Sequence, residues 1–469
     1  MKNLIRPIKA FRAHLSLFWC AAILILIFWG LIIVFGPSVH IRDYWTTPMR
    51  ALIYARTNCF DLLECINGFA QLTVHNDSVK FFPSAFELIH ASILGYWSMS
   101  ASRFIGVACW LLIFVLLVAA HKSFFPTPNI ISKALYLYWL FICTMYIGFL
   151  RFSAPFSIHR SLPALCVASS AYLLWVPLPK QITKIRIPLL GILSVISLFS
   201  FANGALLFLA VMATLALKKS KQILWFSILA SICFYFYSLI VNFGHSSGWS
   251  SKASPTLSKG FSFLLDFAVW PISSILENIS LIALLGGLAL IIILGLYLQK
   301  INPRISLSSE LEVGNFRSAL GFYSFIILFY SSVPVLVTLQ RGYSSMQERY
   351  FIESSLFNAA IVGVLLVMML KLQMHKAKFI ILLISGSLLA INLFMLSDLD
   401  KSFSDNYLYS NINTVECLQR APIITTKVVE NCGVDKEFGL WRYHKKRGDR
   451  VWMDEYSSGL NAVLKRTKQ

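Results

Sequence analysis

Long apolar runs separated by short polar stretches are the feature of this sequence that most restricts its fold. A helix that crosses a bilayer needs about 20 apolar residues, and such runs recur from residue 15 to residue 397. Hydrophobic residues make up 57% of the chain and charged residues 13%, compared with about 45–50% and about 25% in soluble domains. The runs do not alternate with the period of barrel strands, so we expect an all-α polytopic membrane bundle.

About eleven runs are long enough to predict spans. A twelfth segment, 261–274, is short and contains Asp266 and Pro271, so we interpret it as a re-entrant or interfacial helix. The predicted spans are 15–36, 103–121, 134–151, 162–179, 185–202, 204–218, 222–242, 279–299, 318–338, 351–371 and 378–397.

The charges orient these spans. The formal net charge is +20, which in a soluble protein would suggest nucleic acid. Here the lysines and arginines cluster between alternate spans, as the positive-inside rule requires, so we expect the bilayer and no nucleic acid as partner. The N-terminus is then cytoplasmic. A membrane module, 1–397, contains a long first outer loop, 37–102, and an outer tail of 398–469 follows it.

The cysteines are consistent with this orientation. Five of the nine fall inside predicted spans, where a thiol behaves as a small apolar residue. The other four form two local pairs in segments predicted to lie outside, Cys59 with Cys65 and Cys417 with Cys432. An oxidising compartment permits both disulfides, and four unpaired thiols remain the alternative.

No nucleotide or metal motif accompanies the membrane pattern. The chain contains no GxxxxGK[ST] loop, no GxGxxG after a strand, no HExxH and no CxxC metal pattern. The predicted spans also contain few charges of the kind that proton or ion coupling requires. Polar chemistry is therefore expected on the outer face.

The first outer loop begins with one candidate base. Asp43 follows the first span closely and is flanked by Arg42, Tyr44 and Trp45. An acid held above the bilayer beside a cation and aromatic rings suits a general base acting on a lipid-carried substrate. An ordinary interfacial charge with an aromatic anchor is the other interpretation.

The last outer loop, 339–351, contains the candidate phosphate ligands. Arg341, Gln347 and Arg349 lie around a glycine there, and arginine forks match phosphate oxygens. Solvated loop arginines are the alternative. In the first loop, the polar stretch 74–83 precedes 84–97, whose apolar spacing predicts a helix on the membrane surface.

Four stretches together resemble the GT-C class of membrane glycosyltransferases, and in particular a group of bacterial polytopic GT-C-type proteins. The matching stretches are RDYW (42–45), HNDSVKFFP (75–83), SFANG (200–204) and RGYSSMQERY (341–350). The sequence departs from the pattern where Arg42 replaces the first acid of a pair and where Ser78 to Lys80 replace a second histidine.

The resemblance implies sugar transfer from a polyprenyl-phosphate donor to a cell-envelope glycan such as O-antigen, on the outer face of the bacterial inner membrane. Asp43 would be the base, and Arg341 and Arg349 would bind the donor phosphate. The residues around the sugar would be Arg42, His75, Asn76 and Gln347. No nucleotide cofactor is implied, and the need for a divalent metal stays open because GT-C members differ in it.

Three other functions remain as alternatives. A lipid-linked glycan flippase or transporter would need a charged path through the bilayer. An O-antigen polymerase usually has its largest outer loop in the second half of the chain, whereas here the largest inter-span loop is the first. A non-catalytic membrane scaffold is the third.

Overall fold

The structure is a computed structural model. It describes residues 74–94 (except 76–77), 99–126, 132–142 (except 134 and 141), 157–243, 310–341, 350–371, 417–433 and 445–464 (except 447), together with residues 23, 66, 68, 70, 263, 264 and 267.

Apart from one short hairpin, the regular structure of the described residues is helical, as the apolar runs predict. Seven helices coincide with predicted spans: α6 (Met99–Phe124), α8 (Ser157–Trp175), α9 (Lys180–Leu198), α10 (Ala205–Leu217), α11 (Ile223–Phe243), α14 (Glu310–Arg341) and α15 (Phe351–Lys371).

Three of these helices contain stretches long and apolar enough to cross a membrane: Gln181–Leu198, Ile223–Val241 and Asn315–Thr338. The apolar parts of α6, α10 and α15 are shorter. The predicted spans 15–36, 279–299 and 378–397 lie wholly or almost wholly outside the described residues. The count of about eleven spans therefore stays a prediction, whereas a helical membrane protein is what the described helices indicate.

One boundary differs clearly from the prediction. Helix α14 begins at Glu310 rather than at residue 318, because hydropathy marks only the apolar part of a helix. The apolar window of α14 starts at Asn315, and the turns before it include Glu310 and Glu312. The backbone hydrogen bonds of the helix continue through these polar turns, although their charged side chains do not favour burial in lipid.

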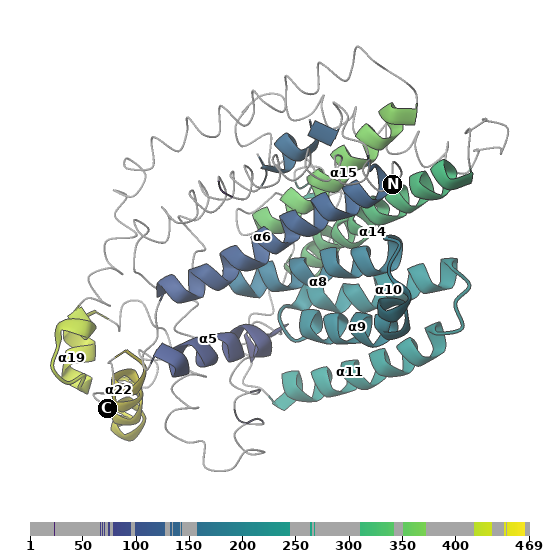
Figure 1. Ribbon diagram of the computed structural model, residues 1–469. Helices are drawn as coiled ribbons and strands as arrows, with labels where there is room; N and C mark the ends of the chain where they lie inside the picture. Colours follow the sequence, from purple (N-terminus) through teal and green to yellow (C-terminus); the bar gives the residue numbers. More distant parts are fainter. Residues whose placement is uncertain are drawn as a thin grey trace.

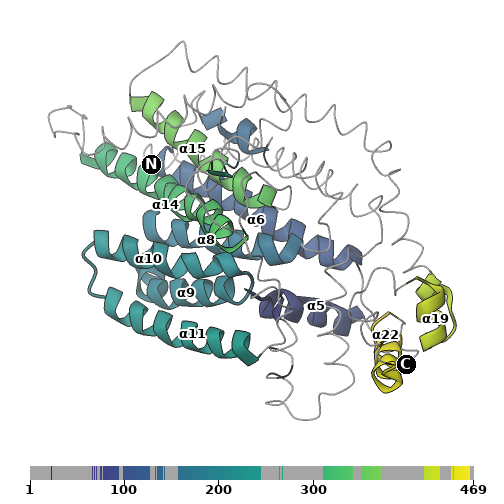
Figure 2. The same cartoon turned by 180° about the vertical axis from the view of Figure 1, so that it is seen from behind.

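Helix α8 is the centre of the bundle and packs against α6, α9, α14 and α15. Figures 1 and 2 show these helices side by side, with α11 at the edge. Small residues let neighbouring helices approach closely. A Cβ at Gly321 would overlap the Trp175 ring, and one at Gly363 would overlap the Tyr323 ring. These glycines fix α14 against α8 and α15.

The polar stretch 74–83 forms a hairpin and the start of a helix. Strands β1 (Val74–His75) and β2 (Ser78–Val79) pair antiparallel, and α5 (Phe81–Leu94) follows. The Phe82 amide donates to the Phe199 carbonyl at 3.2 Å, which ties the start of α5 to the end of α9.

Helix α5 fits the predicted surface helix. Its polar residues Glu87 and His90 are buried, whereas Ile89 is 53% and Ile93 is 78% exposed. An apolar face turned outward, with a polar face turned toward the protein, is the arrangement that suits a helix lying against lipid.

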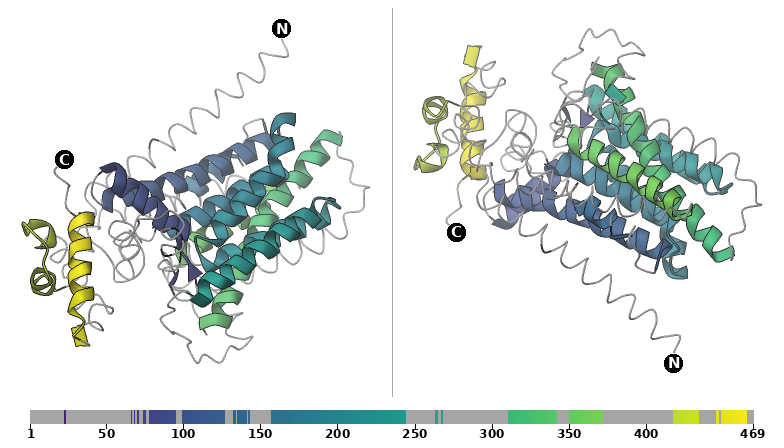
Figure 3. Two further views of the ribbon diagram at one scale, coloured as in Figure 1. Left: turned by 90° about the horizontal axis from the view of Figure 1, so that it is seen from below. Right: turned by 90° about the horizontal axis from the view of Figure 1, so that it is seen from above.

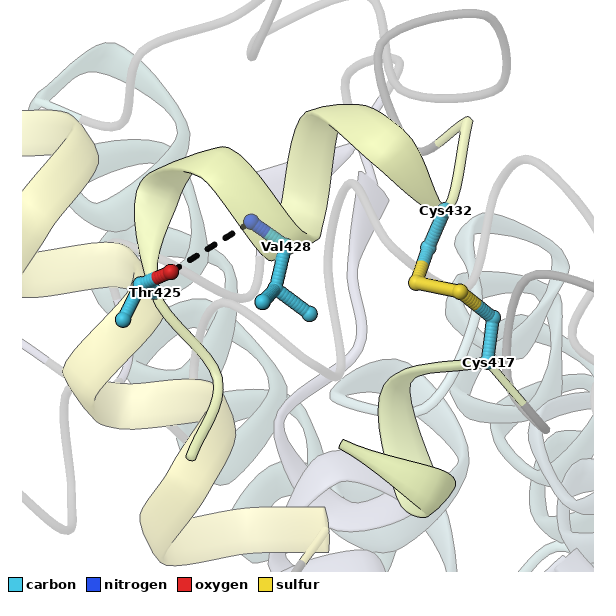
Figure 4. The surroundings of a disulfide bond; sticks show 4 residues. All are labelled: Cys417, Thr425, Val428 and Cys432. Atoms are coloured by element: carbon cyan, nitrogen blue, oxygen red, sulfur yellow. Dashed lines mark hydrogen bonds between the residues drawn. A yellow bond between two sulfur atoms is a disulfide. The ribbon is translucent and has the colours of Figure 1, made fainter. Parts of the chain in front are cut away.

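The C-terminal tail contains α19 (Thr426–Asn431) and α22 (Arg450–Leu464). Both lie at one end of the molecule, on the same side as α5 (Figure 3). The Cys417–Cys432 disulfide that the local cysteine spacing predicts is present, with Cα atoms 5.6 Å apart. Figure 4 shows this disulfide at one end of α19 and the Thr425 cap at the other.

Candidate functional site

Most of the residues singled out from the sequence lie outside the described residues. These are Asp43, Arg42, Asn76, Gln347, Arg349, Cys59 and Cys65. The backbone of His75 lies in β1, paired with Ser78, and Arg341 is the last residue of α14. Their roles stay predictions.

The described parts of the segments that are predicted to lie outside nevertheless meet at one end of the bundle. The bond from Phe82 to Phe199 brings 75–83 to the turn that contains SFANG. The guanidinium of Arg160 lies 5.0 Å from the ring centroid of Phe201 and 4.7 Å from that of Tyr350. Three of the four stretches that carry the resemblance are thus joined directly or through Arg160.

A tight turn places the SFANG stretch. The chain leaves α9 at Leu198 and enters α10 through the 3-10 turn η2 (Ala202–Gly204). Gly204 is required there, since a Cβ on this residue would overlap the Ser197 carbonyl. The turn leaves Asn203 buried, with its side-chain nitrogen unpartnered among the described residues.

The centre of the site is an ion pair between α8 and α15. Arg160 Nη1 donates to Glu353 Oε1 at 2.7 Å. Arg160 is 7% exposed and Glu353 is 5% exposed. A buried charge without its partner is strongly unfavourable, whereas a paired one is tolerated, so each residue holds the other in the protein interior.

Aromatic rings enclose this pair. Besides stacking on Arg160, Phe201 lies 5.3 Å from the His159 ring, and Tyr350 lies 5.8 Å from Phe263. Ser354, next to Glu353, donates its hydroxyl hydrogen to the Phe267 carbonyl. Phe263 and Phe267 belong to the segment predicted as re-entrant or interfacial, and both are fully buried. The rings therefore shield the pair from solvent.

The ion pair uses only one of the two carboxylate oxygens of Glu353. The second oxygen of Glu353, Oε2, has no hydrogen-bond partner among the described residues. The arrangement can hold a hydrogen-bond donor beside a fixed cation. Within the described part of the chain, no three His, Cys, Asp or Glu side chains cluster as metal ligands.

The sequence pattern does not mark Arg160 or Glu353 as site residues. A usable signal was present, because the two opposite charges lie at the predicted outer ends of 162–179 and 351–371. That signal predicts that the two side chains are close only once α8 and α15 are known to pack together.

Comparisons of the chain with protein-family models, with curated proteins and with solved structures found no match.

Proposed function

We propose that this chain is a GT-C-type membrane glycosyltransferase. It moves a sugar from a polyprenyl-phosphate donor to a cell-envelope glycan such as O-antigen, on the outer face of the bacterial inner membrane. Asp43 takes the proton of the acceptor hydroxyl, the sugar carbon bonds to that oxygen, and polyprenyl phosphate leaves. Arg341 and Arg349 bind the donor phosphate, while Arg42, His75, Asn76 and Gln347 surround the sugar.

The observation that carries the proposal is the meeting of separate outer segments at one end of the bundle. Residue 82, residues 199 and 201, and residue 350 come from three stretches of the chain, yet one hydrogen bond and one stacked guanidinium connect them. A transferase needs its donor and acceptor groups held together in this way.

The tail supports the topology on which the proposal depends. A disulfide persists in an oxidising compartment such as the periplasm, and Cys417 is bonded to Cys432. Helix α5, from the predicted first outer loop, lies at the same end of the molecule as α19 and α22 (Figure 3). Eleven spans with the N-terminus in the cytoplasm put all of these elements outside.

The described residues give a flippase less support. A flippase needs polar groups along a path through the bilayer. The buried lysine, arginine, aspartate and glutamate side chains of the described residues are Lys80, Glu87, Arg160 and Glu353. All four belong to segments that are expected at the outer end, which suits a surface reaction better than passage.

The test is transfer by the full-length protein in proteoliposomes supplied with a panel of polyprenyl-phosphate sugars and the host's lipid-linked glycan. Asp43→Asn is expected to abolish transfer, since general-base help contributes about 10²–10⁴-fold in rate. Asp77→Asn, in the same loop, is the matched control and should retain activity. Full activity of Asp43→Asn would refute the role of Asp43, and no transfer by the wild-type protein would refute the function.

A further inference from the structure

Several buried polar atoms near the ion pair lack hydrogen-bond partners among the described residues. They include Glu353 Oε2 and the hydroxyl of Tyr330 in α14, along with the hydroxyls of Ser161 and Ser355, which lie close to Arg160 and Glu353 in sequence. Tyr330 is 1% exposed and is one of the largest fully buried side chains. Buried polar atoms in native proteins almost always have a partner, and a charged acceptor is the most costly to leave unsatisfied, so the second oxygen of Glu353 calls for an occupant.

The packing of α14 against α15 places the oxygen atoms of Glu353 and Tyr330 at similar heights in the bundle. The two helices run antiparallel, and Gly363 faces the Tyr323 ring. A helix rises about 1.5 Å per residue, so Tyr330 lies about 10.5 Å along α14 from that contact. Glu353 lies about 15 Å from it along α15, and because the helices are antiparallel both displacements point the same way. The two residues are therefore within about one helical turn of each other in height.

The chemistry of the two atoms selects the group that fits between them. An ionised carboxylate oxygen only accepts hydrogen bonds, whereas a phenol can donate one. A hydroxyl group satisfies both, because it donates to the carboxylate and accepts from the phenol. An ammonium group would satisfy only the acceptor, and it would lie close to the positive charge of Arg160.

We propose that Glu353 Oε2 and the Tyr330 hydroxyl form a subsite that binds a hydroxyl group of the sugar substrate. The inference rests on the proposed function and adds the residues that recognise the sugar. Arg160 is a positioning residue, since it holds the carboxylate through Oε1 and is itself held between Phe201 and Tyr350. A site with these two groups discriminates against an analogue that lacks the hydroxyl.

The same helix supplies a matched control. Tyr323 lies two turns from Tyr330 in α14 and is equally buried, but its hydroxyl is hydrogen-bonded to His121 Nδ1 at 3.1 Å. Tyr323→Phe therefore removes a hydrogen bond within the protein. Tyr330→Phe removes a hydroxyl that has no protein partner among the described residues.

The experiment measures dissociation constants of the full-length protein in lipid nanodiscs. The probes are a panel of polyprenyl-phosphate hexoses and N-acetylhexosamines, with polyprenyl phosphate alone as the reference. Tyr330→Phe is expected to weaken binding of the preferred sugar lipid about 10-fold, the size of one hydrogen bond, and to leave the reference unchanged. Tyr323→Phe should change neither. Glu353→Gln should weaken sugar binding further, because a charged acceptor is lost and the counter-charge that positions Arg160 is lost with it.

Thermal unfolding of the ligand-free protein gives a second measurement. Tyr330→Phe should leave the melting temperature unchanged, whereas Tyr323→Phe should lower it. Unchanged sugar affinity in Tyr330→Phe would overturn the inference and indicate an ordered water at the subsite, while a wild-type preference for one sugar lipid would still support the transferase. If no sugar lipid binds better than polyprenyl phosphate, the proposed function fails together with the inference.

Discussion

The bundle end that contains the ion pair and the C-terminal tail differ in how one polar side chain of each is bonded. In the tail, Asn461 uses both ends of its amide on Ile424, accepting from the backbone nitrogen at 2.7 Å and donating to the carbonyl at 2.6 Å. In the bundle, Glu353 uses one oxygen on Arg160 and leaves the other unpartnered among the described residues. Asn461 therefore joins two parts of the tail, whereas Glu353 retains an acceptor that no described residue uses.

The largest expected effect comes from breaking the ion pair. Arg160→Met leaves the Glu353 charge buried without a partner and should lower the free energy of unfolding by about 3–5 kcal/mol. Chemical unfolding of the purified protein in detergent measures the loss. A tail-specific probe, such as proteolysis within 417–464, should report no matching change.

A double variant separates charge from packing. Adding Glu353→Leu to Arg160→Met removes both charges, and replacing a buried pair with apolar residues is often neutral or stabilising. Stability should therefore return to near the wild-type value while sugar binding stays lost. If the double variant were as unstable as Arg160→Met, the pair would not be the source of the effect.

Breaking the tail disulfide should have the next largest effect. Cys417 and Cys432 are 15 residues apart, and a loop of that length is worth about 3 kcal/mol in the chain-entropy model. Cys417→Ser with Cys432→Ser should make the tail sensitive to protease and leave the unfolding midpoint of the bundle unchanged. Reductant should act in the same way on the tail of the wild-type protein and have no effect on the tail of the serine variant. Equal loss from the bundle would show that the two regions are coupled.

These contrasts also show what the sequence could predict. Helix positions followed from hydropathy, because a backbone in lipid must form its hydrogen bonds within the helix. Helix α15, for example, covers the predicted span 351–371. The Cys417–Cys432 disulfide followed from local spacing and the expected compartment. Both features depend on neighbouring residues in the chain.

The ion pair could not be predicted in the same way. Arg160 and Glu353 lie 193 residues apart, and their contact depends on which faces of α8 and α15 pack together. Close contacts set that packing, for example those of Gly321 with Trp175 and of Gly363 with Tyr323. Nothing in the sequence marks these residues as contact partners. Hydropathy fixes the length of a helix but not its rotation.

A smaller effect is expected from the amide in α22. Asn461→Ala leaves the nitrogen and the carbonyl of Ile424 without these partners, and Ile424 is almost fully buried. The tail should lose about 2 kcal/mol, since each unsatisfied buried group costs about 1–3 kcal/mol. Asn431→Ala, at the exposed end of α19, is the control. Protease resistance of the tail measures both, and equal losses would argue against a special role for Asn461.

The smallest effect is expected at the helix cap. The Thr425 side chain accepts a hydrogen bond from the Val428 amide at 3.4 Å (Figure 4). Thr425→Ala should cost the tail about 1 kcal/mol, and Thr425→Ser should cost much less because serine caps equally well. Urea unfolding of the tail, followed by a fluorophore attached to α22, measures the difference.

Combining the cap variant with the serine variant tests how the tail is built. Helix α19 has only six residues, too few to be stable alone, so its cap at Thr425 and its disulfide at Cys432 support the same short element. Variants that share an element are not additive, and Thr425→Ala should cost clearly less once the disulfide is absent. An identical cost in both backgrounds would mean that α22 holds α19 in place without the disulfide. The tail would then resemble the bundle in depending on helix packing.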